Sequence, residues 1–98
     1  MPVFAVTYTY TDDTAGRDEH RPAHKEYLNS LAVQGVNLCS GPFGADETPG
    51  ALLLISAATK ADALDATEGD PFRRQGLVAD VSARAWTPML GRLAPEMG

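Results

Sequence analysis

The stretch Ala51 to Ala57, ALLLISA, decides the fold more than any other part of this 98-residue chain. It is a nearly continuous apolar run with the length of a strand, and it is shorter than a typical buried helix. The turn residues of Asp46 to Gly50, DETPG, precede it. Such a run between turns is typical of a strand with neighbours on both sides. The sequence therefore predicts a central, well-covered strand at this position.

Working outward, three more segments have the alternation and the β-branched or aromatic content of strands. They are Val3 to Tyr10, Val36 to Ser40 and Val78 to Thr87. Gly41-Pro42 is expected to end the second of them, because proline cannot donate a ladder hydrogen bond.

Two helices are predicted between these strands. The first runs from Pro22 to about Gln34, because proline suits the first helical turn and Gly35 is a natural C-terminal cap. The residues before it, Thr11 to Arg21, are expected to form a polar turn. The second helix is expected over Thr59 to Glu68, where a threonine followed three residues later by an aspartate resembles a capping box.

The element order is therefore β-α-β-β-α-β, and the simplest topology for it is the ferredoxin-like fold, an α+β architecture. It places a four-stranded antiparallel sheet under two helices on one face, in a single domain over residues 1–98. We expect Ala51, Leu53 and Ile55 to need cover on the other face. This requirement predicts a homodimer with two sheets packed face to face, a dimeric α/β barrel.

Charge and composition exclude several classes. Eight basic residues against thirteen acidic ones give a net charge of −5, so nucleic acid is not an expected partner. No run approaches the ~20 apolar residues of a membrane span, and the first residues do not read as a signal peptide. The single cysteine, Cys39, fits a reducing, cytoplasmic location and is expected to be a small buried side chain.

No metal or cofactor is indicated by the sequence. One cysteine and two histidines do not supply a zinc site, which needs four ligands or three with water. A glycine-rich phosphate loop is also missing.

Two titratable residues are candidates for chemistry. His24 precedes Leu28 and Leu31 by four and seven positions, so it belongs to the buried stripe of its helix. It is either a satisfied core residue or a site residue at a pocket. Asp70 is expected at a helix C-terminus, where a carboxylate opposes the helix dipole. It is either a turn residue or a carboxylate that orients a histidine.

Five features in this order add a resemblance: Arg21-Pro22-Ala23-His24, Tyr27-Leu28, Ser40-Gly41-Pro42, Asp70-Pro71-Phe72, and Trp86 with Pro88. Over about residues 3–88 the chain resembles the YciI-like (YCII-related) family. The resemblance implies a ferredoxin-like dimeric α/β barrel with a His–Asp active site, here His24 and Asp70. It also implies lyase or isomerase chemistry on small cyclic or aromatic compounds, as in a related dehydrochlorinase and in muconolactone isomerases.

Further residues are expected around that site. Arg21 is a candidate for binding a carboxylate or phenolate, and Ser40 and Gly41 for contacting a ligand. Phe72 and Trp86 are candidates for an apolar wall. His20 is expected on the surface, outside the helix. Each also has a purely structural interpretation, as a solvated, turn or core residue.

Two functions remain open at this point. The first is an enzyme that uses a His24–Asp70 acid–base pair on a small-molecule substrate. The second is a non-catalytic module that binds a small ligand or a protein and uses the pair structurally. An open cavity beside His24 favours catalysis or ligand binding, whereas a sealed pair favours the structural role.

Overall fold

Four antiparallel strands form one sheet, in the order β2-β3-β1-β4, in the computed structural model, which describes residues 1–97. The strands are β1 (Val3–Tyr10), β2 (Asn37–Pro42), β3 (Gly50–Ser56) and β4 (Val78–Trp86). The predicted ferredoxin-like order and the antiparallel sheet are confirmed. β3 pairs with both β1 and β2, as expected for the apolar run that forms it.

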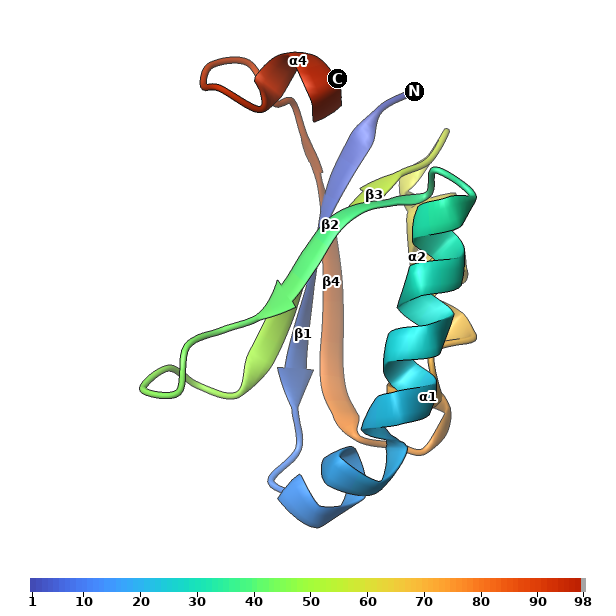
Figure 1. Ribbon diagram of the computed structural model, residues 1–98, viewed down its shortest axis with the longest axis vertical. Coiled ribbons are helices and arrows are strands. Elements are labelled where there is room, and N and C mark those ends of the chain that lie inside the picture. The colour runs from blue at the N-terminus through green and yellow to red at the C-terminus, as the bar shows by residue number, and fades with distance from the viewer. Residues whose placement is uncertain (98) are drawn as a thin grey trace.

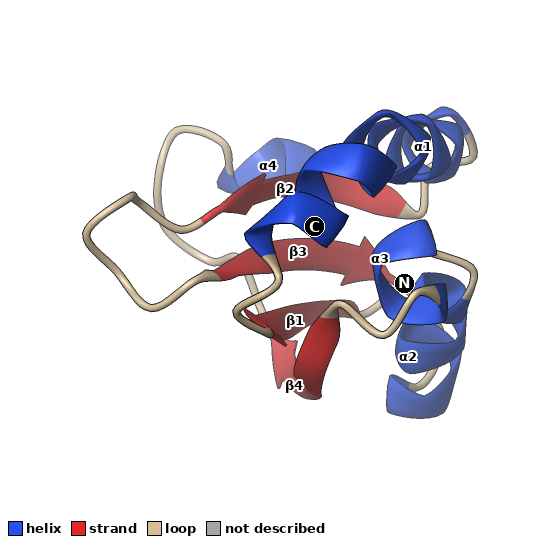
Figure 2. Cartoon of the chain, turned by 90° about the horizontal axis from the view of Figure 1, so that it is seen from below, coloured by secondary structure: helices blue, strands red, loops and turns tan. Residues whose placement is uncertain are grey.

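The helices are α1 (Thr14–Val33), α2 (Lys60–Glu68), α3 (Pro71–Arg74) and α4 (Ala94–Met97). Figure 2 shows α1, α2 and α3 on one side of the sheet, as predicted for the two main helices. α2 begins where the sequence predicts, since the Thr59 hydroxyl accepts a hydrogen bond from the backbone N–H of Asp62. α4 lies beyond the end of the sheet, near the N-terminus (Figure 1).

The start predicted for α1 at Pro22 was wrong, because the helix begins two turns earlier. Asp13 caps it by accepting the backbone N–H of Gly16 at 2.8 Å. Arg17, which is buried, donates to the carbonyl of Thr11 and lies over the ring of Tyr10 at 4.9 Å. A local cap and one buried arginine therefore stabilise turns that carry no apolar stripe.

Pro22 lies inside α1 rather than at its first turn. Its ring removes the N–H that would bond to Asp18 and crowds that carbonyl. Figure 1 shows the first turns of α1 inclined to the axis of the rest of the helix. His20 is part of these turns and half-buried, so its placement outside the helix was also wrong.

β2 is an edge strand that runs two residues further than predicted, through Gly41-Pro42. An edge strand tolerates proline, because one side of its backbone needs no sheet partner. Cys39 lies on this edge and is exposed, so the prediction of a buried cysteine was wrong.

The two faces of β3 are the reverse of the prediction. Leu53 and Ile55 are 1% and 0% exposed, and they lie opposite Val6 and Phe4 of β1 on the face under the helices. Directly opposed residues share a face, so this is the core face. The open face of β3 instead carries Leu52, which is 37% exposed. A continuous apolar run has no alternation that assigns its faces.

The uncovered surface of the sheet is called the open face below. It carries mixed side chains from all four strands, in register with one another: Ala5, Thr7, Cys39, Leu52, Leu54, Arg84 and Trp86. No helix in residues 1–97 has the length and apolar character to cross a membrane.

Candidate functional site

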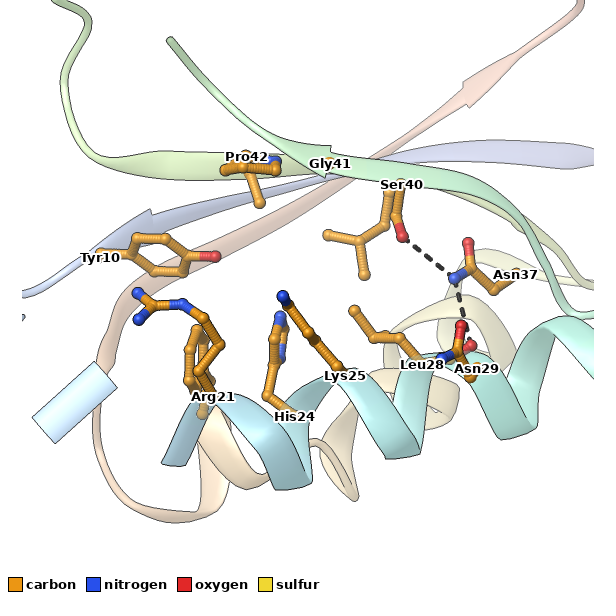
Figure 3. A pocket seen from close by; sticks show the side chains of 13 residues that line it. Tyr10, Arg21, His24, Lys25, Leu28, Asn29, Asn37, Ser40, Gly41 and Pro42 are labelled. Atoms are coloured by element: carbon orange, nitrogen blue, oxygen red, sulfur yellow. Dashed lines mark hydrogen bonds between the residues drawn. The ribbon is translucent and has the colours of Figure 1, made fainter. Parts of the chain in front are cut away.

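A cavity of about 340 Å³ lies between α1 and the β2–β3 edge of the sheet. Figure 3 shows Arg21, His24 and Lys25 reaching up from α1, with Tyr10, Ser40 and Pro42 on the sheet side. Its lining combines side chains from α1, three strands and α3: Tyr10, Arg21, His24, Lys25, Leu28, Asn29, Asn37, Ser40, Gly41, Pro42, Ala51, Leu53 and Phe72. An open cavity therefore adjoins His24.

Asp70 lies behind this cavity, fully buried at 0% exposure. Its Oδ1 accepts hydrogen bonds from the backbone N–H of Phe72 at 3.0 Å and lies 2.7 Å from His24 Nδ1. Its Oδ2 accepts the Tyr8 hydroxyl at 2.8 Å. Three partners make the burial of a carboxylate tolerable, since an unpaired buried charge is strongly unfavourable.

The backbone around Asp70 differs from the prediction. Asp70 follows α2 but caps the N-terminus of α3, where a carboxylate is favourable. The expectation of an unfavourable position at a helix C-terminus was wrong, because a new helix starts at Pro71. Gly69 before it allows Tyr27 to approach closely, since a Cβ there would lie 2.7 Å from the tyrosine oxygen.

His24 is held on two sides. Its Nδ1 is bound to Asp70, and its ring stacks on Phe72 with centroids 3.8 Å apart and planes 5° apart. The side chain is 12% exposed and lines the cavity. Within residues 1–97 its Nε2 forms no hydrogen bond, so this nitrogen is available to a ligand. The separation from Asp70 falls in the ~2.6–3.2 Å range of an acid–base pair.

Burial shifts the pKa of the two tyrosines near the His24–Asp70 pair. It raises the pKa of Tyr8 far above its ordinary value, and the negative charge of Asp70 adds to this effect. Burial also raises the pKa of Tyr10, again reinforced by Asp70 and partly opposed by Arg17. Both phenols therefore stay protonated at neutral pH, and the Tyr8 hydroxyl donates to Asp70.

Most of the other residues singled out by the sequence come together here. Arg21, Ser40, Gly41 and Phe72 line the same cavity as His24. Trp86 does not, since it ends β4 opposite Val3 and is 43% exposed. Its position on β4 places it on the open face.

Sequence reasoning missed three contributors. Tyr8 and Tyr10 were interpreted only as strand residues, although their shared face leads to the site. Lys25 was not selected, yet it follows His24 directly and reaches the cavity. Tyr8 and Tyr10 lie on an apolar strand face but each ends in a polar hydroxyl, and this is the sequence signal that could have found these two residues.

A metal site is not formed by these side chains. In the described part of the chain, no three histidine, cysteine, aspartate or glutamate side chains cluster as metal ligands do.

Solved structures share this fold. One is 5-chloro-2-hydroxyhydroquinone dehydrochlorinase from Burkholderia phenoliruptrix AC1100 in complex with 2,5-dihydroxybenzoquinone. It is 24% identical, with a TM-score of 0.71, and the match covers 86% of this chain and 92% of that one. Another is a candidate antibiotic biosynthesis monooxygenase from Nitrosomonas europaea, at 16% identity and TM-score 0.55, covering 88% and 96%. At these identities the likeness shows the fold alone.

Sequence comparison identifies the family. No curated protein matches the chain. The sequence profile of the YCII-related domain matches residues 1–87, which include both members of the His24–Asp70 pair and the whole sheet. The chain therefore belongs to the YCII-related domain family.

Proposed function

We propose that this protein is a small-molecule enzyme of the lyase or isomerase type. His24 transfers a proton, and Asp70 orients the ring of His24. The observation that carries the proposal is the 2.7 Å contact between His24 Nδ1 and Asp70 Oδ1 at the wall of an open cavity. A histidine held in this way can accept a proton at Nε2, while the carboxylate stabilises the imidazolium that forms.

The proposed chemistry balances without an oxidant or reductant. His24 Nε2 removes a proton from a carbon or oxygen of the substrate, and the bonding electrons remain on the substrate. In an isomerisation, the imidazolium returns the proton to another atom of the same molecule. In an elimination, the electron pair left on the substrate forms a new double bond, and the leaving group departs with the electrons of its own bond. The imidazolium of His24 then passes its proton to solvent.

Three observations support a small cyclic or aromatic substrate. The cavity of about 340 Å³ lies at the lower end of the range that ligand sites occupy, ~300–1,000 Å³. Leu28 and Pro42 give it apolar walls, backed by the buried side chains of Leu53 and Phe72. The dehydrochlorinase of the same fold acts on a compound of this class, and its complex holds a single-ring quinone.

We also propose that two copies pair through the open face, as a dimeric α/β barrel. Leu52 and Trp86 remain partly exposed there in a single chain, at 37% and 43%. Exposed apolar side chains on a sheet without helices are typical of a surface that is covered by a partner. Pairing would leave the cavity intact, because the cavity lies on the helix-covered face.

The test is a turnover screen. The wild-type protein would be incubated with chlorinated hydroxyhydroquinones and unsaturated lactones, and products would be followed by absorbance and mass spectrometry. For any compound turned over, His24→Ala is expected to lower the rate by about 10²–10⁴-fold. His20→Ala is the matched control, because His20 lies on the same helix and does not line the cavity.

Two results would contradict the proposal. Full activity in His24→Ala would show that the histidine carries no proton. Binding of these compounds by the wild-type protein, with no turnover of any of them, would favour the non-catalytic ligand-binding module instead.

A further inference from the structure

The charge of the cavity is opposite to that of the chain. The protein carries a net charge of −5, yet Arg21 and Lys25 line the cavity beside His24 and no aspartate or glutamate does. Asp70 lies behind His24, fully buried and occupied by three hydrogen bonds. A ligand in the cavity therefore meets the guanidinium of Arg21 and the ammonium of Lys25, and no carboxylate among the lining residues.

The two cations differ in how far they are neutralised. Arg21 pairs with Asp18, one turn earlier on α1. Lys25 lies four residues after Arg21 and lines the same cavity, and Figure 3 shows its side chain rising from α1 toward the sheet. Among residues 1–97 it forms no ion pair. Lys25 therefore supplies a positive charge at the cavity without a counterion.

A neutral donor faces these cations. Figure 3 shows the Tyr10 hydroxyl pointing into the cavity from β1, on the side opposite α1. It forms no hydrogen bond with any described residue. A phenol is protonated at neutral pH, and burial raises the pKa of Tyr10 further above its ordinary value. It can therefore donate to an oxygen that lies between it and Lys25.

The rest of the lining favours an organic ring. Leu28 and Pro42 present apolar surface that a small inorganic ion would leave uncovered, with Leu53 and Phe72 buried behind them. Phe72 meets Tyr10 edge to face at 5.6 Å and stacks on His24. These aromatic contacts fix the walls, so a flat ligand enters a site that is largely formed.

We propose that the cavity selects a planar, single-ring organic anion, a carboxylate or phenolate, whose charged oxygen lies between Lys25 and the Tyr10 hydroxyl. This inference rests on the proposed function and deepens it by naming the charge of the substrate. It adds Lys25 and Tyr10 as binding residues next to Arg21. The charged oxygen would anchor the ring while its reacting atom faces Nε2 of His24.

The test compares four probes by titration calorimetry and by chemical-shift changes in the amide spectrum: benzoate, benzamide, benzylamine and inorganic phosphate. Benzoate and benzamide have nearly the same shape, so their difference reports charge. Benzoate is expected to bind at least about tenfold more tightly than benzamide, and benzylamine more weakly than both. Phosphate is expected to bind more weakly than benzoate, since it cannot cover the apolar wall.

Variants assign the selectivity to residues. Lys25→Gln is expected to weaken benzoate by about tenfold and to leave benzamide unchanged. Lys60→Gln is the control, because it removes the same charge from the start of α2, away from the cavity. Tyr10→Phe is expected to weaken benzoate by about three- to tenfold, the loss of one hydrogen bond.

Equal affinity for benzoate and benzamide would overturn the inference, as would no benzoate binding at about 10 mM. An unchanged benzoate affinity in Lys25→Gln would also overturn it. These outcomes are separate from those of the turnover screen, because binding is measured without catalysis. A wild-type protein that selects benzoate but turns over nothing would contradict only the proposed function.

Discussion

The two faces of the sheet differ in what they do, although adjacent residues of one strand build both. On β3, Leu53 is 1% exposed under the helices, whereas Leu52 next to it is 37% exposed on the open face. The covered face carries the hydrophobic core and, at its β2 edge, the cavity with His24. The open face carries mixed, partly exposed side chains, among them Leu52 and Trp86.

This difference shows how one strand supports both stability and function. Side chains alternate across a strand, so each leucine belongs to one face only. The covered face can hold a buried carboxylate because helices α1 and α3 and strand β1 bring it hydrogen-bond partners. The open face has no such layer in residues 1–97, and we propose that a second copy of the chain covers it.

The largest expected effect is at the buried carboxylate of the covered face. Asp70→Ala removes the partner of Tyr8 and His24 and the cap of α3. The Tyr8 hydroxyl, the His24 ring and the Phe72 N–H then lack their acceptor at about 1–3 kcal/mol each, so we expect a loss of at least about 3 kcal/mol, measured by urea unfolding. Asp65→Ala, an exposed aspartate on α2, is the control. A loss below about 1 kcal/mol for Asp70→Ala would contradict the account of the covered face.

The leucine pair on β3 tests the comparison directly. Leu53→Ala is expected to lower the free energy of unfolding by about 2–5 kcal/mol, because it leaves a cavity in the core. Leu52→Ala is expected to cost about 1 kcal/mol or less in the single chain. Urea unfolding at low protein concentration measures both, and sedimentation shows whether Leu52→Ala weakens pairing. Equal losses at the two positions would contradict the assignment of faces.

Tyr8→Phe is expected to have a smaller effect. It deletes one of three hydrogen bonds to a buried carboxylate, at a cost of about 1–3 kcal/mol in the free energy of unfolding. The remaining two bonds keep Asp70 partly satisfied. Thermal and urea unfolding of the variant would measure the loss.

The raised pKa of Tyr8 also gives a pH dependence. The folded state holds the phenol proton more tightly than the unfolded chain, in which tyrosine titrates near pH 10. Stability is therefore expected to be level below about pH 10 and to fall as pH rises above it. In Tyr8→Phe the fall should be shallower, leaving the part due to Tyr10. An identical alkaline profile in both proteins would show that Tyr8 does not contribute.

The smallest effect is expected at the start of α1. Asp13→Ala removes the cap that accepts the N–H of Gly16 and should cost about 1 kcal/mol. Amide hydrogen exchange should then be faster in the turns before Pro22 and unchanged in the turns after it. Unchanged protection before Pro22 would show that buried Arg17, and not the cap, determines where α1 begins.

Much of the fold follows from the sequence, and the misses have physical causes. The apolar run that forms β3 and the threonine that caps α2 are local features of the sequence, and the structure confirms both predictions. The early turns of α1 were not predictable from apolar spacing, since Asp13 and Arg17 stabilise them through single polar contacts. The faces of β3 could not be assigned because both carry leucine.

The site was also only partly predictable. His24 and Asp70 were found through pattern and resemblance, and the structure brings them to 2.7 Å. Tyr8 was hidden in an apolar strand face, because its role depends on a partner 62 residues away in the sequence. Trp86 was placed in the site because the sequence does not show which face of β4 it occupies.

The central claim is that Asp70 fixes the proton on Nδ1 of His24, so that Nε2 is free to accept one from a ligand. A long-range ¹H–¹⁵N correlation spectrum of the histidine rings measures this directly. We predict that the neutral ring of His24 carries its proton on Nδ1, and that Asp70→Asn shifts the population toward the other tautomer. A neutral His24 protonated on Nε2 in the wild-type protein would contradict the claim.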